Sequence, residues 1–284
     1  MKQIVVISGK GGTGKTVITG ALAVLANNKI MVDCDVDAAD LHLLLHPQPK
    51  EQHQFRCGAT AFIKQEICVK CGKCQQVCRF DAVKNKYFID PISCEGCAFC
   101  SHICPVKAIE MRENISGEWY ISDTDYGPFV HAKLGIGEEN SGKLVALVRQ
   151  KAKRLADQKN SNWVIIDGPP GIGCPVIASV VGVDKALIVT EPTLSGIHDF
   201  KRILKLVKQL NIPAIVVINK FDINLENSNE IEIICEQQQI AFVQKIPYSK
   251  EVPKAITAGK IINEYSPHSE VSSNIEKIWN FIRD

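Results

Sequence analysis

The sequence predicts an α/β protein with a doubly wound, mostly parallel sheet, interrupted once by a small inserted α+β module. Two observations lead to this prediction. Continuous apolar segments alternate with helical segments at both ends of the 284-residue chain, which is typical of a parallel sheet covered on both faces. Between these ends, residues 51–125 have a different character and contain two copies of one short cysteine pattern. We therefore expect a host domain over residues 1–50 and 126–284.

The elements of the host domain are expected in a regular order. The apolar strand QIVVIS leads into a helix over Gly14–Asn27, and a second strand, KIMVD, follows. After the insertion comes a helix over Gly142–Gln158, for which Asn140 or Ser141 is the expected N-cap. Four more strands are expected, with helical segments such as Ser195–Leu210 between them: WVIID, KALIVT, AIVVIN and IAFVQKIP.

The last helical segment, SSNIEKIWNFIRD, is predicted to pack onto the domain. Ile275, Ile278, Trp279 and Ile282 recur at helical spacing and form one apolar face. The opposite face carries charges of both signs, whereas a helix that binds a membrane surface is usually basic on that side.

The bulk composition excludes several classes of protein. The formal net charge of +2 gives no basic excess for general binding to nucleic acid or to a membrane surface. No apolar stretch approaches the roughly 20 residues of a membrane span, and the chain opens directly on an apolar strand without a targeting pattern. We therefore expect a cytoplasmic protein without stable membrane insertion, whose twelve cysteines stay reduced.

A phosphate-binding loop follows the first strand. The motif G-x-x-x-x-G-K-[ST] is formed by Gly9, Lys10, Gly11, Gly12, Thr13, Gly14, Lys15 and Thr16, and it opens a helix. Its glycines allow backbone N–H groups to surround phosphate oxygens, and the helix N-terminus adds a positive dipole end. Lys15 is expected to neutralise the β- and γ-phosphates, and Thr16 is expected to hold Mg²⁺.

The second lysine of the loop, Lys10, makes the motif similar to the deviant Walker A of the MinD/Mrp/nitrogenase-iron-protein class of P-loop ATPases. In that class, this lysine reaches the nucleotide of the other subunit. The resemblance therefore implies an ATP-dependent homodimer, an ATPase that cycles between ATP and ADP, and a catalytic role for Lys10.

Further segments resemble the same class. In VDCDVDAADL, the resemblance implies that Asp35 orients the attacking water and that Asp33 supports the site. In WVIIDGPPGIG, Asp167 would hold Mg²⁺ through water, and the Gly171 N–H would contact the γ-phosphate. Adenine would be read by two positions nearer the C-terminus, which are Asn219 and Pro247.

The inserted module carries two copies of the bacterial ferredoxin pattern, C-x₂-C-x₂-C-x₃-C. In that pattern, the fourth cysteine of each run binds the cluster of the other run. The resemblance implies one [4Fe–4S] cluster on Cys68, Cys71, Cys74 and Cys104, and a second on Cys94, Cys97, Cys100 and Cys78. Zinc bound by C-x₂-C pairs is the alternative. The sequence departs from the family in one place, because Arg79 follows Cys78 where proline follows Cys104.

The whole chain resembles MinD-superfamily ATPases that carry an inserted ferredoxin domain. Three functions are compatible with it. The first is ATP-gated electron transfer through the two clusters, with an unidentified redox partner. The second is assembly or carriage of iron–sulfur clusters, as in Mrp-type relatives, and the third is a positioning ATPase. The cysteines outside the module are expected to be buried, inert thiols: Cys34, Cys57, Cys174 and Cys235.

Overall fold

The apolar strands predicted from the sequence lie side by side in the computed structural model, which describes residues 1–135 and 141–284. The strand order is β11-β10-β9-β1-β8-β2-β7-β6-β3, and the described pairings among β11, β10, β9, β1, β8, β2 and β7 are parallel. The parallel strands are β1 (Lys2–Ser8), β2 (Lys29–Asp33), β7 (Gly127–Leu134), β8 (Trp163–Pro170), β9 (Lys185–Thr190), β10 (Ala214–Asn219) and β11 (Val243–Ile246). The predicted mostly parallel α/β sheet is therefore confirmed.

The chain divides into two compact units. The first contains Met1–His53, Glu118–Leu134 and residues 141–284, and the second contains Gln54–Gly117. The long strands β3 (Gln48–Ile63) and β6 (Ile109–Thr124) have residues in both units.

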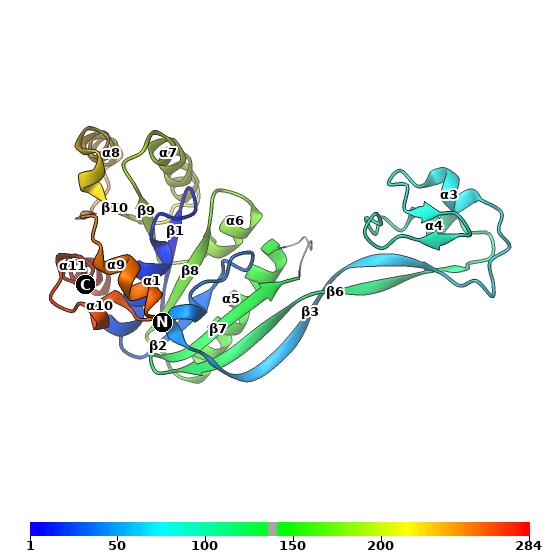
Figure 1. Cartoon of the computed structure of the whole chain (residues 1–284), viewed down its shortest axis with the longest axis horizontal. Helices are drawn as coiled ribbons and strands as arrows, with labels where there is room; N and C mark the ends of the chain where they lie inside the picture. The colour runs from blue at the N-terminus through cyan, green and yellow to red at the C-terminus, as the bar shows by residue number, and fades with distance from the viewer. Residues whose placement is uncertain (136–140) are drawn as a thin grey trace. The chain divides into compact units, whose positions relative to one another are not determined.

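Helices cover both faces of the sheet in the first unit (Figure 1). One face packs against α1, α10 and α11, whose buried residues share a core cluster with Ile4, Ile165 and Val217 of the sheet. The helices of the first unit are α1 (Lys15–Leu25), α2 (His42–Leu45), α5 (Ser141–Gln158), α6 (Cys174–Val180), α7 (Leu194–Gln209), α8 (Leu225–Gln237), α9 (Glu251–Thr257), α10 (Ile262–Tyr265) and α11 (Glu270–Arg283), with a 3₁₀ turn over Phe221–Ile223.

Several predicted helix ends move by one or two residues for local reasons. Helix α1 begins at Lys15 because Gly14 is left-handed (φ 95°), and it ends at Leu25 because Ala26 is extended. Helix α5 begins at Ser141, while the other expected N-cap residue, Asn140, lies outside the described residues.

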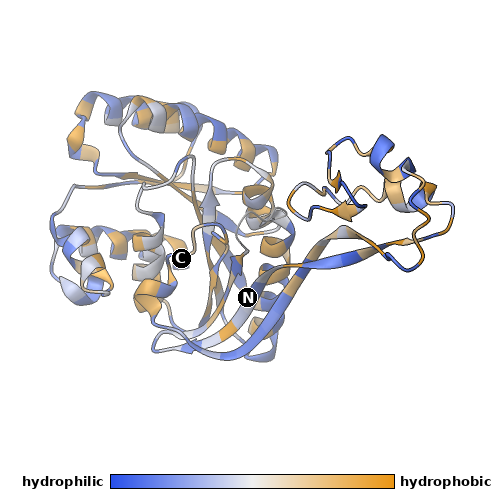
Figure 2. Cartoon of the chain, turned by 45° about the vertical axis from the view of Figure 1, so that its right-hand side comes forward, coloured by the Kyte–Doolittle hydropathy of each residue, from blue (hydrophilic) through white to orange (hydrophobic). Residues whose placement is uncertain are grey.

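The C-terminal helix packs as predicted. Ile275, Ile278, Trp279 and Ile282 of α11 are buried in the core, and the Trp279 ring meets the edge of Trp163 at a centroid distance of 5.1 Å. Figure 2 shows that helices of this unit carry both apolar and polar residues, as amphipathic helices on a sheet do. No helix in the described ranges combines the length and apolar character needed to cross a membrane.

The second unit is small and contains the cysteine repeats. Besides the ends of β3 and β6 it has helices α3 (Lys73–Val77) and α4 (Phe99–Ile103), and an antiparallel pair of β4 (Val83–Lys84) and β5 (Phe88–Ile89). Its core consists of Ala61, Ile63, Cys74, Val83, Ile89 and Ile109, and other module cysteines pack against this core. Such a small apolar core is typical of units that depend on bound metal or disulfides for stability.

Candidate functional site

The phosphate-binding loop connects β1 to α1 in the predicted strand–loop–helix arrangement. Gly12 and Gly14 have positive φ angles of 77° and 95°, which a residue with a Cβ adopts only at a cost. At Gly14 a Cβ would also lie 2.5 Å from the side-chain nitrogen of Asn219. The tight loop therefore depends on glycine at this position.

Two polar side chains of the loop are buried at its centre. The Thr13 side chain is 1% exposed, and its hydroxyl has no hydrogen-bond partner among the described residues. Lys15 is 6% exposed. A buried hydroxyl without a partner costs about 1–3 kcal/mol, so a bound group that supplies an acceptor would stabilise this loop. Phosphate oxygens have that chemistry.

Acidic side chains from two neighbouring strands gather beside the loop. Asp33 at the end of β2 and Asp167 in β8 are each 1% exposed, and the two residues are paired in the sheet register. Thr19 of α1 donates a hydrogen bond of 2.9 Å to Asp167. Burial raises the pKa of Asp167 to about 6, against the opposing effects of Lys15 and of hydrogen bonds from Thr16 and Thr19.

Asp33 and Asp35 have different positions in this acidic group. The buried Asp33 carboxylate accepts hydrogen bonds from the backbone N–H groups of Asp35 (3.0 Å) and Leu41 (3.3 Å), so it fixes the loop after β2. Burial and the nearby charge of Asp167 raise the pKa of Asp33 well above its usual value. Asp35 is less buried, and burial raises its pKa to about 6 although Lys15 opposes the shift. Together these carboxylates form a region that favours a bound cation.

Lys10 is held by an acidic residue of its own chain. Its ammonium lies 2.6 Å from Glu191, which follows β9, and it also bonds the hydroxyls of Thr193 (3.3 Å) and Ser195 (3.4 Å). Lys220 pairs with the other oxygen of Glu191 at 3.2 Å. Burial opposes ionisation of Glu191, but the two lysines outweigh it and lower its pKa.

A cavity adjoins the phosphate-binding loop on the side of β10 and β11. It has a volume of about 320 Å³, within the usual range for small-molecule sites, and Asn219 lines it together with Gly12 and Gly14. The Asn219 amide donates to the Thr13 carbonyl at 2.8 Å, so it also fixes the loop. Pro247 does not line this cavity in the part of the chain that is described, whereas both of its neighbours, Ile246 and Tyr248, do.

Gly171 lies directly after β8 with a φ of 90°. Its N–H, which was expected to contact a γ-phosphate, donates to the Ser8 carbonyl at 2.9 Å. In this conformation that N–H is not directed at a nucleotide.

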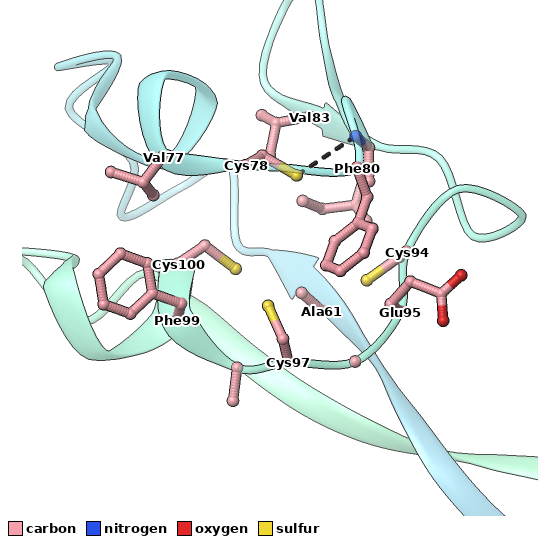
Figure 3. Close-up of a pocket in the computed structure, with 14 residues that line it drawn as sticks. Ala61, Val77, Cys78, Phe80, Val83, Cys94, Glu95, Cys97, Phe99 and Cys100 are labelled. Carbon is pink, nitrogen blue, oxygen red and sulfur yellow. Dashed lines mark hydrogen bonds between the residues drawn. The ribbon is translucent and has the colours of Figure 1, made fainter.

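The eight cysteines of the second unit line two separate pockets. Cys68, Cys71, Cys74 and Cys104 line the first, which we call the Cys68 pocket. Cys78, Cys94, Cys97 and Cys100 line the second, the Cys94 pocket, which Figure 3 shows with its sulfur atoms around one space. Each pocket thus takes three cysteines from one repeat and the fourth from the other.

The surroundings of the two pockets suit thiolate-bound clusters. The fourth cysteine of each repeat accepts a backbone hydrogen bond, from Ala82 to Cys78 (3.3 Å) and from Ala108 to Cys104 (3.2 Å). Apolar residues such as Val83 and Ile109 line the remaining walls. N–H···S bonds and limited solvent are the features by which proteins tune iron–sulfur clusters.

No three His, Cys, Asp or Glu side chains of the described residues are grouped as the ligands of one metal ion. A [4Fe–4S] cluster takes one thiolate at each of four iron atoms, so its sulfur ligands surround a space and do not meet at a single point. Each pocket is lined by four cysteines, the number of thiolates that such a cluster takes.

One expectation about the remaining cysteines is wrong. Cys174 is exposed, because it begins α6 and follows the exposed Gly173 at the helix N-terminus. Cys57 is half-buried, so it too departs from the expected buried state. Cys34 and Cys235 are buried, as expected, and burial raises the pKa of both thiols.

Sequence reasoning did not include Glu191, Thr19 or Lys220 in the site. A signal for Glu191 exists, because it follows the apolar strand KALIVT at the carboxyl edge of a parallel sheet, where ligand sites occur. Thr19 is one helical turn after Lys15, so it lies on the same face of α1.

Comparisons with known proteins agree with this fold and loop. A family profile, CbiA, described as the CobQ/CobB/MinD/ParA nucleotide binding domain, matches residues 4–262. An uncharacterised protein of Methanocaldococcus jannaschii is 35% identical over 99% of this chain and 96% of its own length. A protein of Pyrococcus abyssi named iron-sulfur cluster carrier protein is 24% identical over 99% of this chain and 87% of its own. The solved structure of the septum site-determining protein MinD of Pyrococcus horikoshii, complexed with Mg-ADP, matches with a TM-score of 0.61 and 16% identity, covering 99% of this chain and 95% of the other.

Proposed function

This chain belongs to the CobQ/CobB/MinD/ParA family of nucleotide-binding domains, and from that premise we propose that it is an ATPase that couples nucleotide-dependent dimerisation to electron transfer through two [4Fe–4S] clusters. We assign residues 1–50 and 126–284 to the ATPase domain and residues 51–125 to an inserted ferredoxin domain. The observation that carries the proposal is the lining of two pockets by four cysteines each, in the same chain as a P-loop.

The nucleotide side of the proposal assigns a role to each buried group beside the loop. The backbone N–H groups of the loop and Lys15 hold the phosphates, while Thr16 and Asp167 hold Mg²⁺, which would neutralise charge on the phosphates. Asp35 orients the attacking water, and Asp33 positions Asp35 through its backbone N–H. Alignment and charge neutralisation account for most catalysis of phosphoryl transfer, so these positioning contacts matter for the rate.

Two contacts of the present conformation would have to break when ATP closes the dimer. The Gly171 N–H would leave the Ser8 carbonyl to reach the γ-phosphate, and Lys10 would leave Glu191 to reach the nucleotide of the second subunit. A change of partner for a few groups is a common form of nucleotide switch.

The redox side rests on the two cysteine pockets. Cys68, Cys71, Cys74 and Cys104 would hold one cluster, and Cys94, Cys97, Cys100 and Cys78 the other, each supplying a site that accepts and releases single electrons. The chain's own contribution is the hydrogen bonding to Cys78 and Cys104 and the apolar walls, which adjust the potential and exclude solvent.

Carriage of iron–sulfur clusters is the second candidate function. It is favoured by the similarity to the carrier protein of Pyrococcus abyssi. A carrier releases clusters to an acceptor protein, whereas an electron carrier retains them.

The deciding experiment uses the full chain after anaerobic reconstitution. We expect about eight iron atoms and eight sulfides per chain, and a change in cluster potential in EPR titrations when a non-hydrolysable ATP analogue is added. Cys78→Ala and Cys104→Ala should each impair one cluster, while Cys235→Ala, a control outside both pockets, should impair neither. If nucleotide leaves the potentials unchanged and an apo-ferredoxin acceptor gains iron and sulfide, electron gating is wrong and the carrier function stands.

A further inference from the structure

The two cysteine repeats are equivalent in backbone conformation as well as in sequence. Lys70 and Gly96 occupy the same place in the two repeats and have φ angles of 57° and 62°. Gly72 and Ala98, the next equivalent pair, have φ angles of 77° and 61°. The N–H···S bonds to Cys78 and Cys104 are likewise equivalent. The two repeats thus share these backbone features, while several of the side chains at equivalent positions differ.

The side chains at equivalent positions differ in charge. Lys70 and Lys73 line the Cys68 pocket, and no acidic residue is among its lining residues in the described chain. Glu95 lines the Cys94 pocket, where no lysine or arginine is among the described lining residues. Lys70, Lys73 and Glu95 are all exposed.

The turns that carry the fourth cysteines do not add to this difference. Lys107 follows Cys104 in the turn of the Cys68 pocket, and its equivalent after Cys78 is Asp81 (φ 51° and 49°). Asp81 makes a 3.0 Å ion pair with Lys84, and Arg79 adds a further cation to the same turn, so this turn carries no net negative charge. The difference in charge therefore lies in the lining residues, with two lysines at the Cys68 pocket and one glutamate at the Cys94 pocket among the described residues.

These charges act differently on the two oxidation states of a bound cluster. A cluster that gains one electron gains one negative charge, which a nearby cation stabilises and a nearby anion destabilises. Local charge is one of the properties that set the potentials of iron–sulfur clusters. The charged side chains that line the pockets are thus one difference between their electrostatic surroundings, and this difference has a definite sign.

We propose that the cluster of the Cys68 pocket has the higher reduction potential, so that a single electron given to the module resides beside Lys70 and Lys73. The inference rests on the proposed function, since it requires both pockets to hold clusters. A single electron supplied by an external one-electron reductant would then reside mainly at the Cys68 pocket at equilibrium, whichever pocket it reached first.

The test locates the electron directly. The reconstituted full chain is reduced with less than one equivalent of dithionite, which supplies the electron, and the paramagnetically shifted ¹H signals of the cysteine β-protons are assigned residue by residue. We expect the reduced pattern on Cys68, Cys71, Cys74 and Cys104, with at least a tenfold preference over the other cluster. A tenfold preference corresponds to about 59 mV for one electron.

Charge variants separate this inference from a merely structural effect. Lys70→Glu combined with Lys73→Glu should lower the potential of the Cys68 cluster and move the electron towards the Cys94 pocket, while Glu95→Lys should move it in the same direction by raising the other potential. Lys73→Gln, which keeps the size of the side chain, should give a smaller shift of the same sign. Arg56→Glu, a charge reversal that lines neither pocket, should have little effect.

The outcomes distinguish a failure of the proposed function from a failure of the inference about the electron's location. If the chain takes up no iron or gives no shifted cysteine signals, the proposed function itself is wrong. If both clusters form but the electron resides on the Cys94 cluster, or if the variants with Glu at positions 70 and 73 leave its location unchanged, this inference is overturned while the proposed function stands.

Discussion

Removing the charge of Glu191 should strengthen the proposed ATP-dependent dimer. In the present conformation Glu191 holds Lys10 at 2.6 Å, with the two side chains 14% and 29% exposed. If Lys10 must reach the second subunit, the free energy of this ion pair opposes dimerisation. Glu191→Gln keeps the size of the side chain and an acceptor oxygen, so it changes mainly the charge.

The size of the effect follows from the burial of the pair. Exposed ion pairs contribute about 0.2–1 kcal/mol, and removal of one partner from a buried pair costs about 3–5 kcal/mol. The partial burial of Lys10 and Glu191 places this pair between these limits, at about 1.4 kcal/mol, or tenfold. Two chains release one pair each on dimerisation, so we expect the dimer dissociation constant of Glu191→Gln to fall by about a hundredfold.

The assay is sedimentation equilibrium with a non-hydrolysable ATP analogue. The analogue is present at a saturating concentration, so a change in nucleotide affinity does not alter the measured dimer dissociation constant. Glu230→Gln is the matched control, because Glu230 makes a 3.0 Å ion pair with Lys201 at an exposed site on α7 and α8. In a Lys10→Ala background, Glu191→Gln should give no gain. An unchanged or weaker dimer for Glu191→Gln alone would refute the role given to this contact.

Three further predictions concern the first unit. Gly9→Ala should lower the free energy of unfolding by more than about 2 kcal/mol, because the added Cβ would lie 2.6 Å from a backbone carbon of α7. Gly11→Ala should not lower it, because the space around Gly11 is open. Urea titrations of the two variants give the comparison. Burial lowers the pKa of His131 to about 4, below its unfolded value of 6.5. The stability that neutral His131 contributes is therefore present above pH 6.5, and the free energy of unfolding should fall by about 2 kcal/mol between pH 7 and pH 5. The fall should be smaller in His131→Asn, and an equal fall in that variant would contradict the role given to His131. Asn219→Ala should weaken ATP binding several-fold in calorimetry, because the phosphate-binding loop loses the hydrogen bond from Asn219 to the Thr13 carbonyl. Asn227→Ala, which loses a similar hydrogen bond on α8, should leave ATP binding unchanged.

The phosphate-binding loop and the cysteine repeats could be predicted because each is formed by a short run of consecutive residues. The loop from Gly9 to Thr16 is eight consecutive residues, and each repeat spans eleven residues, so spacing alone places the functional side chains. The contact between Lys10 and Glu191 joins residues 181 positions apart, and no local pattern indicates it. Tertiary contacts of this kind require the strand order, which places β9 next to β1.

The long strand β3 was also missed, for a different reason. Residues 48–54 of this strand are all exposed, so the alternation of apolar and polar residues that indicates a half-buried strand is absent there. The start of the insertion, predicted at residue 51, consequently falls within β3. The predicted strand IAFVQKIP is shorter than expected, and Phe242, before its start at Val243, stacks on Phe281 at a centroid distance of 4.3 Å.

The loop between the nucleotide site and β3 is held at both ends, and this constrains how nucleotide could affect the module. At one end, the Asp33 carboxylate ties the N–H groups of Asp35 and Leu41 together, so a movement of Asp35 towards a water would also move Leu41. At the other end, His46 bonds the Gly259 carbonyl at 2.7 Å, directly before β3 begins at Gln48. These contacts fix both ends of the segment between Asp33 and Gln48. The Asp33 carboxylate therefore supports the position of Leu41 as well as that of Asp35, so Asp33→Asn should loosen both ends of this turn.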